Sequence, residues 1–155
     1  MIRPATEADA EAIAALWNPW IADTAITFTS TLKTPDDIAQ MIATRPAFFT
    51  TDGVQGFATY GQFRGGDGYA TCMEHSIILS PTARGQGLGR ALLHAVEYHA
   101  RTHGAHQMIA GISAENPAAI AFHTRMGYTE TARIADAGRK FGRFIDLVLM
   151  QKFLS

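Results

Sequence analysis

The sequence has one cysteine, Cys72, no long apolar run and no excess of charge of either sign. A single cysteine excludes an intramolecular disulfide, which is typical of proteins from reducing compartments. No apolar stretch approaches the ~20 residues needed to cross a bilayer, and the first residues lack the continuous apolar core of a secretory signal. We therefore expect a cytoplasmic protein that does not bind membranes.

The charges nearly cancel, with 13 Lys and Arg against 14 Asp and Glu. This balance provides no basic field for nucleic acid or anionic lipid, so any bound anion must be held by local groups. The chain of 155 residues, 47% of them hydrophobic, is long enough to bury one core. We expect a single domain over 1–155.

Helical and strand periodicities alternate along the chain, which predicts an α/β fold with a mixed sheet. The first helix has Thr6 as N-cap and Asp9 as its capping acid. The expected elements are a strand at 2–6, helices at 6–21 and 34–46, a hairpin at 47–63, a strand at 69–81, a helix from Gly85 to about His103, a strand at 106–113, a helix from Asn116 to Gly127, and then strands, the last at 143–153.

The stretch "ARGQGLGRALL" (83–93) follows a predicted strand and opens a predicted helix. The first turn of a helix offers unpaired N–H groups and partial positive charge, which suits an anion. Glycines at 85, 87 and 89 allow a ligand to approach these amides, and Arg84 and Arg90 add charge. These features predict a site for a diphosphate or similar anion.

Two common nucleotide motifs do not fit this turn. A P-loop requires Gly-Lys followed by Ser or Thr, whereas Gly89 is followed by Arg90. The dinucleotide fingerprint needs its third glycine one position later and an acidic residue about 20 residues further on. On these residues alone, the alternative is that the stretch binds no ligand: the glycines only weaken the first turn of the helix, and the arginine is solvated.

Arg84, Gly87 and Gly89 match the Arg/Gln-x-x-Gly-x-Gly/Ala signature of the GNAT family of N-acetyltransferases, in which this turn holds the pyrophosphate of acetyl-coenzyme A (acetyl-CoA). The chain most resembles the branch that acetylates phosphinothricin and methionine sulfoximine or sulfone. Four segments carry this resemblance: "IRPATEADAEAI", "MEHSIILSPTARGQGLGRALL", "ENPAAIAFHTRMGY" and "GRKFGRFIDLVLMQ".

The resemblance implies a GNAT fold, with a twisted, mostly antiparallel mixed sheet flanked by helices. It implies acetyl-CoA as co-substrate, no metal, and a homodimer. In this family one strand also binds the pantetheine arm through its backbone, as an added strand would. The implied cofactor-binding residues are Ile77, Ile78, Leu79, Arg84, Gly85, Gln86, Gly87, Leu88, Gly89, Arg90 and Asn116.

Acetyl transfer to an ammonium group requires a base, and Glu74 is the candidate. It lies within the predicted strand "CMEHSII", where acidic residues are disfavoured, and shares a face with Ser76 and Ile78. The resembled branch has its proposed base here. A solvent-facing glutamate on an edge strand is the alternative.

His123 is the second catalytic candidate, and the resemblance pairs it functionally with Glu74. Its pKa of about 6.5 would allow it to protonate a thiolate or to shuttle the amine proton. A packed histidine bonded to a carbonyl is the alternative. His99 and His103 are one helical turn apart but lack the glutamate of a zinc-protease motif, so we expect no metal site.

The resemblance assigns acceptor binding to Arg64 and Tyr69, together with Glu74. A second basic residue usual in this loop is replaced by Gly66, and Asp67 follows it, which weakens a carboxylate clamp. The segment "KFGR" (140–143) is expected near the site, from the same or a partner subunit.

Three functions remain open. The first is N-acetylation of a small amino-acid-like amine. The second is acetylation of another acceptor, such as a protein N-terminus, a polyamine or an aminoglycoside. The third is a non-catalytic acetyl-CoA sensor, which would keep the glycine turn without needing Glu74.

Overall fold

The computed structural model describes residues 1–155 and places seven strands in one sheet, in the order β1-β2-β3-β4-β5-β7-β6. Only β4 and β5 run parallel, and every other neighbouring pair is antiparallel. The predicted mixed, mostly antiparallel α/β architecture is confirmed. The strands are β1 (Ile2–Pro4), β2 (Ala47–Thr51), β3 (Gly56–Gln62), β4 (Cys72–Leu79), β5 (Gln107–Ser113), β6 (Thr129–Lys140) and β7 (Arg143–Phe153).

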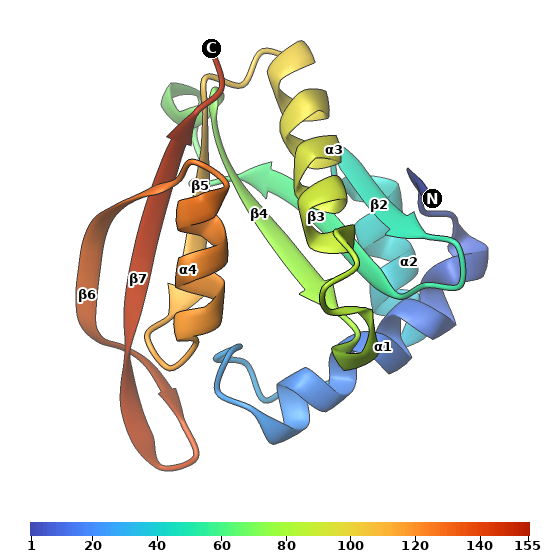
Figure 1. The fold of residues 1–155 in the computed structure, drawn as a ribbon, viewed down its shortest axis with the longest axis horizontal. Coiled ribbons are helices and arrows are strands. Elements are labelled where there is room, and N and C mark those ends of the chain that lie inside the picture. The colour runs from blue at the N-terminus through green and yellow to red at the C-terminus, as the bar shows by residue number, and fades with distance from the viewer.

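Four helices cover the two faces of the sheet: α1 (Ala10–Asp23), α2 (Pro35–Thr44), α3 (Leu88–Thr102) and α4 (Pro117–Arg125). One buried cluster joins α3 to the sheet through residues such as Leu92 and Met108, with α4 side chains packed against it. A second joins α1 and α2 to the opposite face, around Ile13 and Phe57. Figure 1 shows α3 and α4 in front of the sheet and α2 behind it.

The parallel strands β4 and β5 diverge in the middle of the sheet (Figure 1). Their pairing ends at His75 and Ala110, although β4 continues to Leu79 and β5 to Ser113. The backbone of Ile77 and Ile78 is therefore paired with β3 on one side and has no strand partner on the other. This divergence leaves room for an extended ligand between the strands.

Local signals placed most elements correctly. The Asp9 carboxylate accepts a hydrogen bond from the Thr6 backbone N–H at 2.8 Å, as the capping pattern predicted. The helix expected from Gly85 starts instead at Leu88, because Gly85 and Gly87 have φ of +77° and +75° and cannot belong to a right-handed helix. The strand expected from Tyr69 starts at Cys72, because a short 3-10 turn occupies Asp67–Tyr69.

Candidate active site

A cavity of about 510 Å³ opens at the N-terminus of α3. Gly85 and Gly87 are both exposed and in the left-handed region, so their amides are accessible. The structure brings to this cavity every predicted cofactor-binding residue except Gln86, whose side-chain amide donates to the Thr82 carbonyl at 3.2 Å. Those lining it are Ile77, Ile78, Leu79, Arg84, Gly85, Gly87, Leu88, Gly89, Arg90 and Asn116. We call it the α3 cavity.

Gly89 has a different role from the other two glycines. It is buried, and a Cβ there would lie 3.1 Å from Leu79 Cδ1 and 3.5 Å from the Phe122 ring. The glycine therefore allows α3 to approach β4 and α4 closely. Gly89 nevertheless lines the α3 cavity, so its contact with the cofactor stays a prediction.

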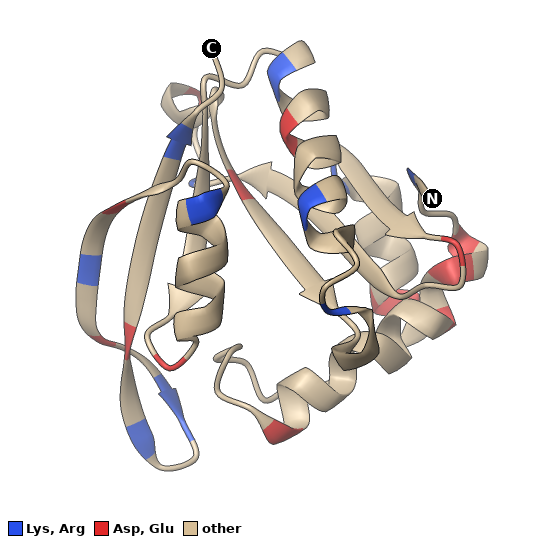
Figure 2. Cartoon of the chain, in the orientation of Figure 1, with Lys and Arg blue, Asp and Glu red and all other residues tan.

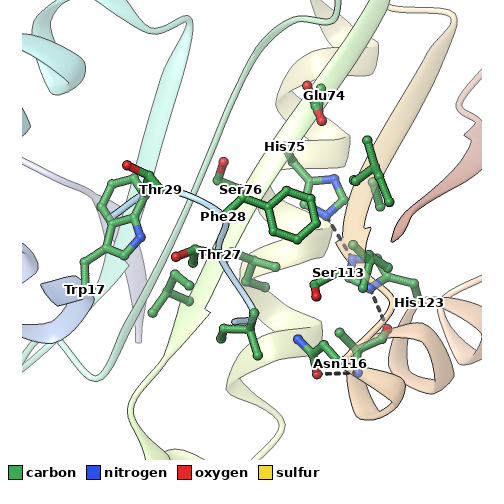
Figure 3. A pocket seen from close by; sticks show the side chains of 18 residues that line it. Trp17, Thr27, Phe28, Thr29, Glu74, His75, Ser76, Ser113, Asn116 and His123 are labelled. Atoms are coloured by element: carbon green, nitrogen blue, oxygen red, sulfur yellow. Dashed lines mark hydrogen bonds between the residues drawn. The ribbon is translucent and has the colours of Figure 1, made fainter. Parts of the chain in front are cut away.

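A second cavity, of about 280 Å³, lies where β4 and β5 diverge. We call it the central cavity. It shares Ile77, Ile78, Asn116 and His123 with the α3 cavity, so the two adjoin along β4. Figure 3 shows Glu74 and His75 at one end of it and Asn116 at the other, where the Asn116 side chain caps α4 by accepting from the Ala119 N–H at 3.2 Å.

Glu74 reaches the central cavity from the middle of β4. Burial raises the pKa of its carboxyl, and the positive charge of Arg45 opposes that rise. Gly111 on β5 leaves space for the Glu74 carboxylate, since a Cβ at this glycine would lie 2.8 Å from Glu74 Oε2. A half-buried carboxylate with a raised pKa and no ion pair is suited to accept a proton.

His123 does not contact Glu74. Its Nε2 lies 3.0 Å from Nε2 of His75, and the two rings stack with centroids 5.1 Å apart. Successive residues of a strand point to opposite faces, so Glu74 and His75 project away from each other. Glu74 and His123 both line the central cavity, but Glu74 and His75, the partner of His123, project to opposite faces of β4. The functional pairing of Glu74 and His123 that the resemblance implies stays a prediction.

The hydrogen bonds fix the tautomers of the two histidines. His123 Nδ1 lies 2.8 Å from the Ala119 carbonyl, and a carbonyl can only accept, so this nitrogen carries hydrogen. Neutral His123 must then accept at Nε2 the hydrogen on His75 Nε2. His75 Nδ1 is left as a buried lone pair without a partner. Neither nitrogen of His123 is free, which favours the packed histidine over a catalytic acid.

A buried polar network supports the histidine pair. The Tyr128 ring meets both imidazoles edge-on, and its hydroxyl donates to Glu97 at 2.7 Å. Lys152 pairs with the same carboxylate at 3.0 Å. Glu97 is therefore both buried and paired. The network thus packs against the histidine pair, which lines the central cavity.

Burial of the histidine pair predicts a pH-dependent stability. Burial, and then the neighbouring His123, lower the pKa of His75 to about 3 from 6.5. The unfolded chain therefore binds a proton that the folded chain does not, and stability is lost as the pH falls from 6.5 toward 3. We expect His75 to contribute a loss of about 1.4 kcal/mol per pH unit in this window.

Urea unfolding from about pH 7.5 down to 5 measures this slope. In His75→Gln, the free energy of unfolding should depend less steeply on pH over the same range. Some dependence should remain, because burial also lowers the pKa of His123. Equal slopes in the two proteins would show that His75 is not held neutral.

Lys140 fixes the loop between α1 and α2 beside the site. Its buried ammonium donates to the Ile21 and Thr27 carbonyls at 2.6 and 2.8 Å. On the same strand, Gly138 lies against the Phe28 ring, where a Cβ would be 2.5 Å from the ring carbons. Phe28 lines the central cavity, so this part of the "KFGR" region reaches the site by way of the loop of its own chain.

Arg64 and Tyr69 lie on the exposed segment after β3, where the guanidinium sits 5.5 Å from the centre of the Tyr69 ring. The structure brings neither into the central cavity.

The chain groups no three His, Cys, Asp or Glu side chains that could hold a metal ion. No helix combines the length and apolar character that a membrane crossing requires.

The match to known proteins agrees with this geometry. The model of the acetyltransferase (GNAT) family matches residues 14–128, so the chain belongs to this family of acetyltransferases. Over 157 residues it is 37% identical to the L-methionine sulfoximine/L-methionine sulfone acetyltransferase of Salmonella typhimurium, covering 97% of this chain and 92% of the relative. A phosphinothricin N-acetyltransferase of Streptomyces coelicolor is 30% identical over 162 residues, covering 97% and 94%.

Solved structures have the same fold. An acetyltransferase from Salmonella typhimurium, determined with its cofactor acetyl-CoA, superposes with a TM-score of 0.94 at 35% identity, covering 100% of this chain and 94% of that one. A ribosomal-protein-alanine N-acetyltransferase from Brucella melitensis superposes with a TM-score of 0.93 at 37% identity, covering 99% of each chain. The predicted family, fold and enzyme class are confirmed.

Proposed function

We propose that the protein transfers the acetyl group of acetyl-CoA to the amine of a small amino acid of the methionine sulfone, methionine sulfoximine or phosphinothricin type. The observation that carries this proposal is the continuity of the two cavities along β4. A ligand whose diphosphate lies on the turn before α3 and whose arm follows Ile77 and Ile78 ends in the central cavity, which Glu74 also lines.

The donor half of the site is built from backbone groups. The open amides at Gly85 and Gly87 suit the pyrophosphate, with Arg84 and Arg90 at the rim of the α3 cavity. The unpaired edge of β4 at Ile77 and Ile78 suits the amides of the pantetheine arm. A backbone N–H on this edge can also polarise the thioester carbonyl as negative charge develops on its oxygen.

Glu74 provides the chemistry on the acceptor side. Its carboxylate removes a proton from the acceptor ammonium, directly or through water, and the freed amine attacks the thioester carbonyl carbon. The C–N bond forms, the C–S bond breaks, and the leaving thiolate takes up a proton. His75 and His123 stay neutral and form a wall of the central cavity.

Two acceptor classes compete. The similarity to a ribosomal-protein-alanine N-acetyltransferase favours a protein N-terminus. A polyamine or aminoglycoside site would be strongly acidic, whereas Glu74 is the only carboxylate that lines the central cavity. A catalytically silent sensor would bind acetyl-CoA and release no thiol.

One assay decides among these functions. Purified protein and acetyl-CoA are incubated with methionine sulfone, methionine sulfoximine, phosphinothricin, spermidine or an alanine-terminated peptide, and thiol release is followed. We expect release with the amino-acid analogues. Release only with the peptide would move the function to protein N-termini, and cofactor binding without release on any acceptor would indicate a sensor.

Further properties of the protein belong to the same proposal. Residues 1–155 form one N-acetyltransferase domain that acts in the cytoplasm without a metal. Lys and Arg are interspersed with Asp and Glu along the chain (Figure 2), which supports the absence of nucleic-acid or membrane partners. Ile134, Phe141 and Phe144 are exposed on the hairpin of β6 and β7, which supports a homodimer formed through this hairpin.

A further inference from the structure

A polar depression of about 490 Å³ lies beside Glu74 and contains an arginine without a partner. Arg45, at the C-terminal end of α2, is half-buried, yet its guanidinium forms no hydrogen bond or ion pair within the chain. Glu74 and Ser76 line both this depression and the central cavity, so the two adjoin. The depression is lined by Thr44, Arg45, Pro46, Gly61, Gln62, Glu74 and Ser76.

Gly61 determines where the guanidinium lies. A Cβ at this glycine would meet Arg45 Nη1 at 3.3 Å and its Cδ at 3.7 Å. Gly61 is also the direct partner of Glu74 in the pairing of β3 with β4. Directly opposite residues of an antiparallel pair project to the same face. The Arg45 guanidinium therefore lies over Gly61, which has no side chain, on the same face of the sheet as the Glu74 carboxylate.

Arg45 and Glu74 are neighbours, but their side chains form neither an ion pair nor a hydrogen bond. The charge of Arg45 is close enough to oppose the rise in the pKa of Glu74 that burial causes, yet the two side chains form no ion pair. The guanidinium is also open to solvent, since none of its nitrogens is among the buried side-chain atoms that lack a partner. It is therefore available to bind an exogenous anion.

We propose that this depression is the subsite for the α-carboxylate of the acceptor, with Arg45 binding the carboxylate while Glu74 receives the α-ammonium. A zwitterionic amino acid carries its two charges on either side of one carbon, so it can bridge an acidic and a basic side chain that do not reach each other. The guanidinium presents several donors in a plane and can hold a carboxylate through two parallel hydrogen bonds. This assignment rests on the proposed N-acetyltransferase function.

The subsite has a consequence for acceptor choice. A peptide N-terminus and a polyamine both offer an amine, but neither has a carboxylate one carbon away. Arg45 would be left unpaired against either, which selects for free α-amino acids. It would also replace the clamp that the Arg64 loop was expected to provide, where Gly66 has no side chain to contribute.

The test compares two acceptors that differ only in the carboxylate: methionine sulfone and its decarboxylated analogue, 3-(methylsulfonyl)propylamine. For Arg45→Gln we expect kcat/KM to fall about 100-fold for methionine sulfone and less than about 3-fold for the amine. Arg45→Lys should recover part of the loss, because it keeps the charge without the planar donors. Arg101→Gln, an exposed site on α3, is the matched control and should change neither value.

Equal losses for both acceptors would overturn the proposal, because they would mean that Arg45 acts through Glu74 or the fold. No loss, or a loss of discrimination in Arg64→Gln instead, would also overturn it. Calorimetric binding of the two ligands in the presence of coenzyme A gives a readout that needs no turnover. If wild-type protein transfers acetyl to neither ligand, the proposed function fails, while the binding comparison still accepts or rejects the subsite.

Discussion

Replacing Glu74 with glutamine is expected to lower kcat about 10²–10⁴-fold for any amine acceptor, while acetyl-CoA binding stays close to wild type. Glutamine keeps the size of the side chain but cannot take the proton from the ammonium. Glu74 lines the central cavity but not the α3 cavity, so the donor site should be undisturbed. Thiol release under saturating substrates and calorimetric binding of acetyl-CoA measure the two quantities.

The pH profile makes this prediction more specific. Because burial raises the pKa of Glu74, the wild-type rate should rise with pH through a value above the ordinary 4.5 of a glutamate. In Glu74→Gln, this rise of the rate with pH should be absent. The substitution should not reduce thermal stability, since the half-buried carboxylate has no ion pair to lose. Glu130→Gln, on exposed β6, is the control; a full rate in Glu74→Gln would remove Glu74 as the base.

Replacing Gly87 with valine is expected to raise the KM for acetyl-CoA at least about 100-fold. Gly87 is the N-cap of α3 with φ of +75°, which costs a β-branched residue about 1–2 kcal/mol or more. The new side chain would also stand in the α3 cavity, over the amides proposed to bind the pyrophosphate. Calorimetric titration with acetyl-CoA and with coenzyme A measures the loss directly.

The chain provides a matched control for the backbone strain. Gly53 also has φ of +75° and open space around it, but it lies in the turn between β2 and β3 and outside the α3 cavity. Gly53→Val should destabilise the fold by a similar amount and leave cofactor affinity unchanged. If Gly87→Val bound acetyl-CoA as tightly as wild type, the pyrophosphate would not bind to the turn before α3.

Local features of the sequence were sufficient to predict the shape of the turn before α3. The glycine spacing predicted exposed backbone amides there, because left-handed φ values and open amides are properties of the turn itself. The binding of an anion to these amides stays a prediction. An acidic residue in the middle of an apolar strand identified Glu74 in the same way. The elements were predicted well because capping residues and periodicity are also local.

The rest of the site depends on residues that are distant in sequence. His75 and His123 are 48 positions apart, and only the docking of α4 on β4 makes them partners. Lys140 reaches the Ile21 carbonyl across 119 positions. Arg45 approaches Glu74 through the register of β3 and β4, which places Gly61 between them. No local signal distinguished His75 or Arg45 from ordinary core or surface residues, whereas the family resemblance had already indicated His123 and the segment that contains Lys140.

A crystal structure with coenzyme A and methionine sulfone bound together tests both halves of the site most directly. We expect the pyrophosphate on the amides of Gly85 and Gly87, and the sulfur between the diverging ends of β4 and β5. We expect the acceptor amine beside Glu74 and the acceptor carboxylate on Arg45. A coenzyme bound outside the α3 cavity, or an acceptor amine on the His123 face of β4, would show that the proposed site is wrong.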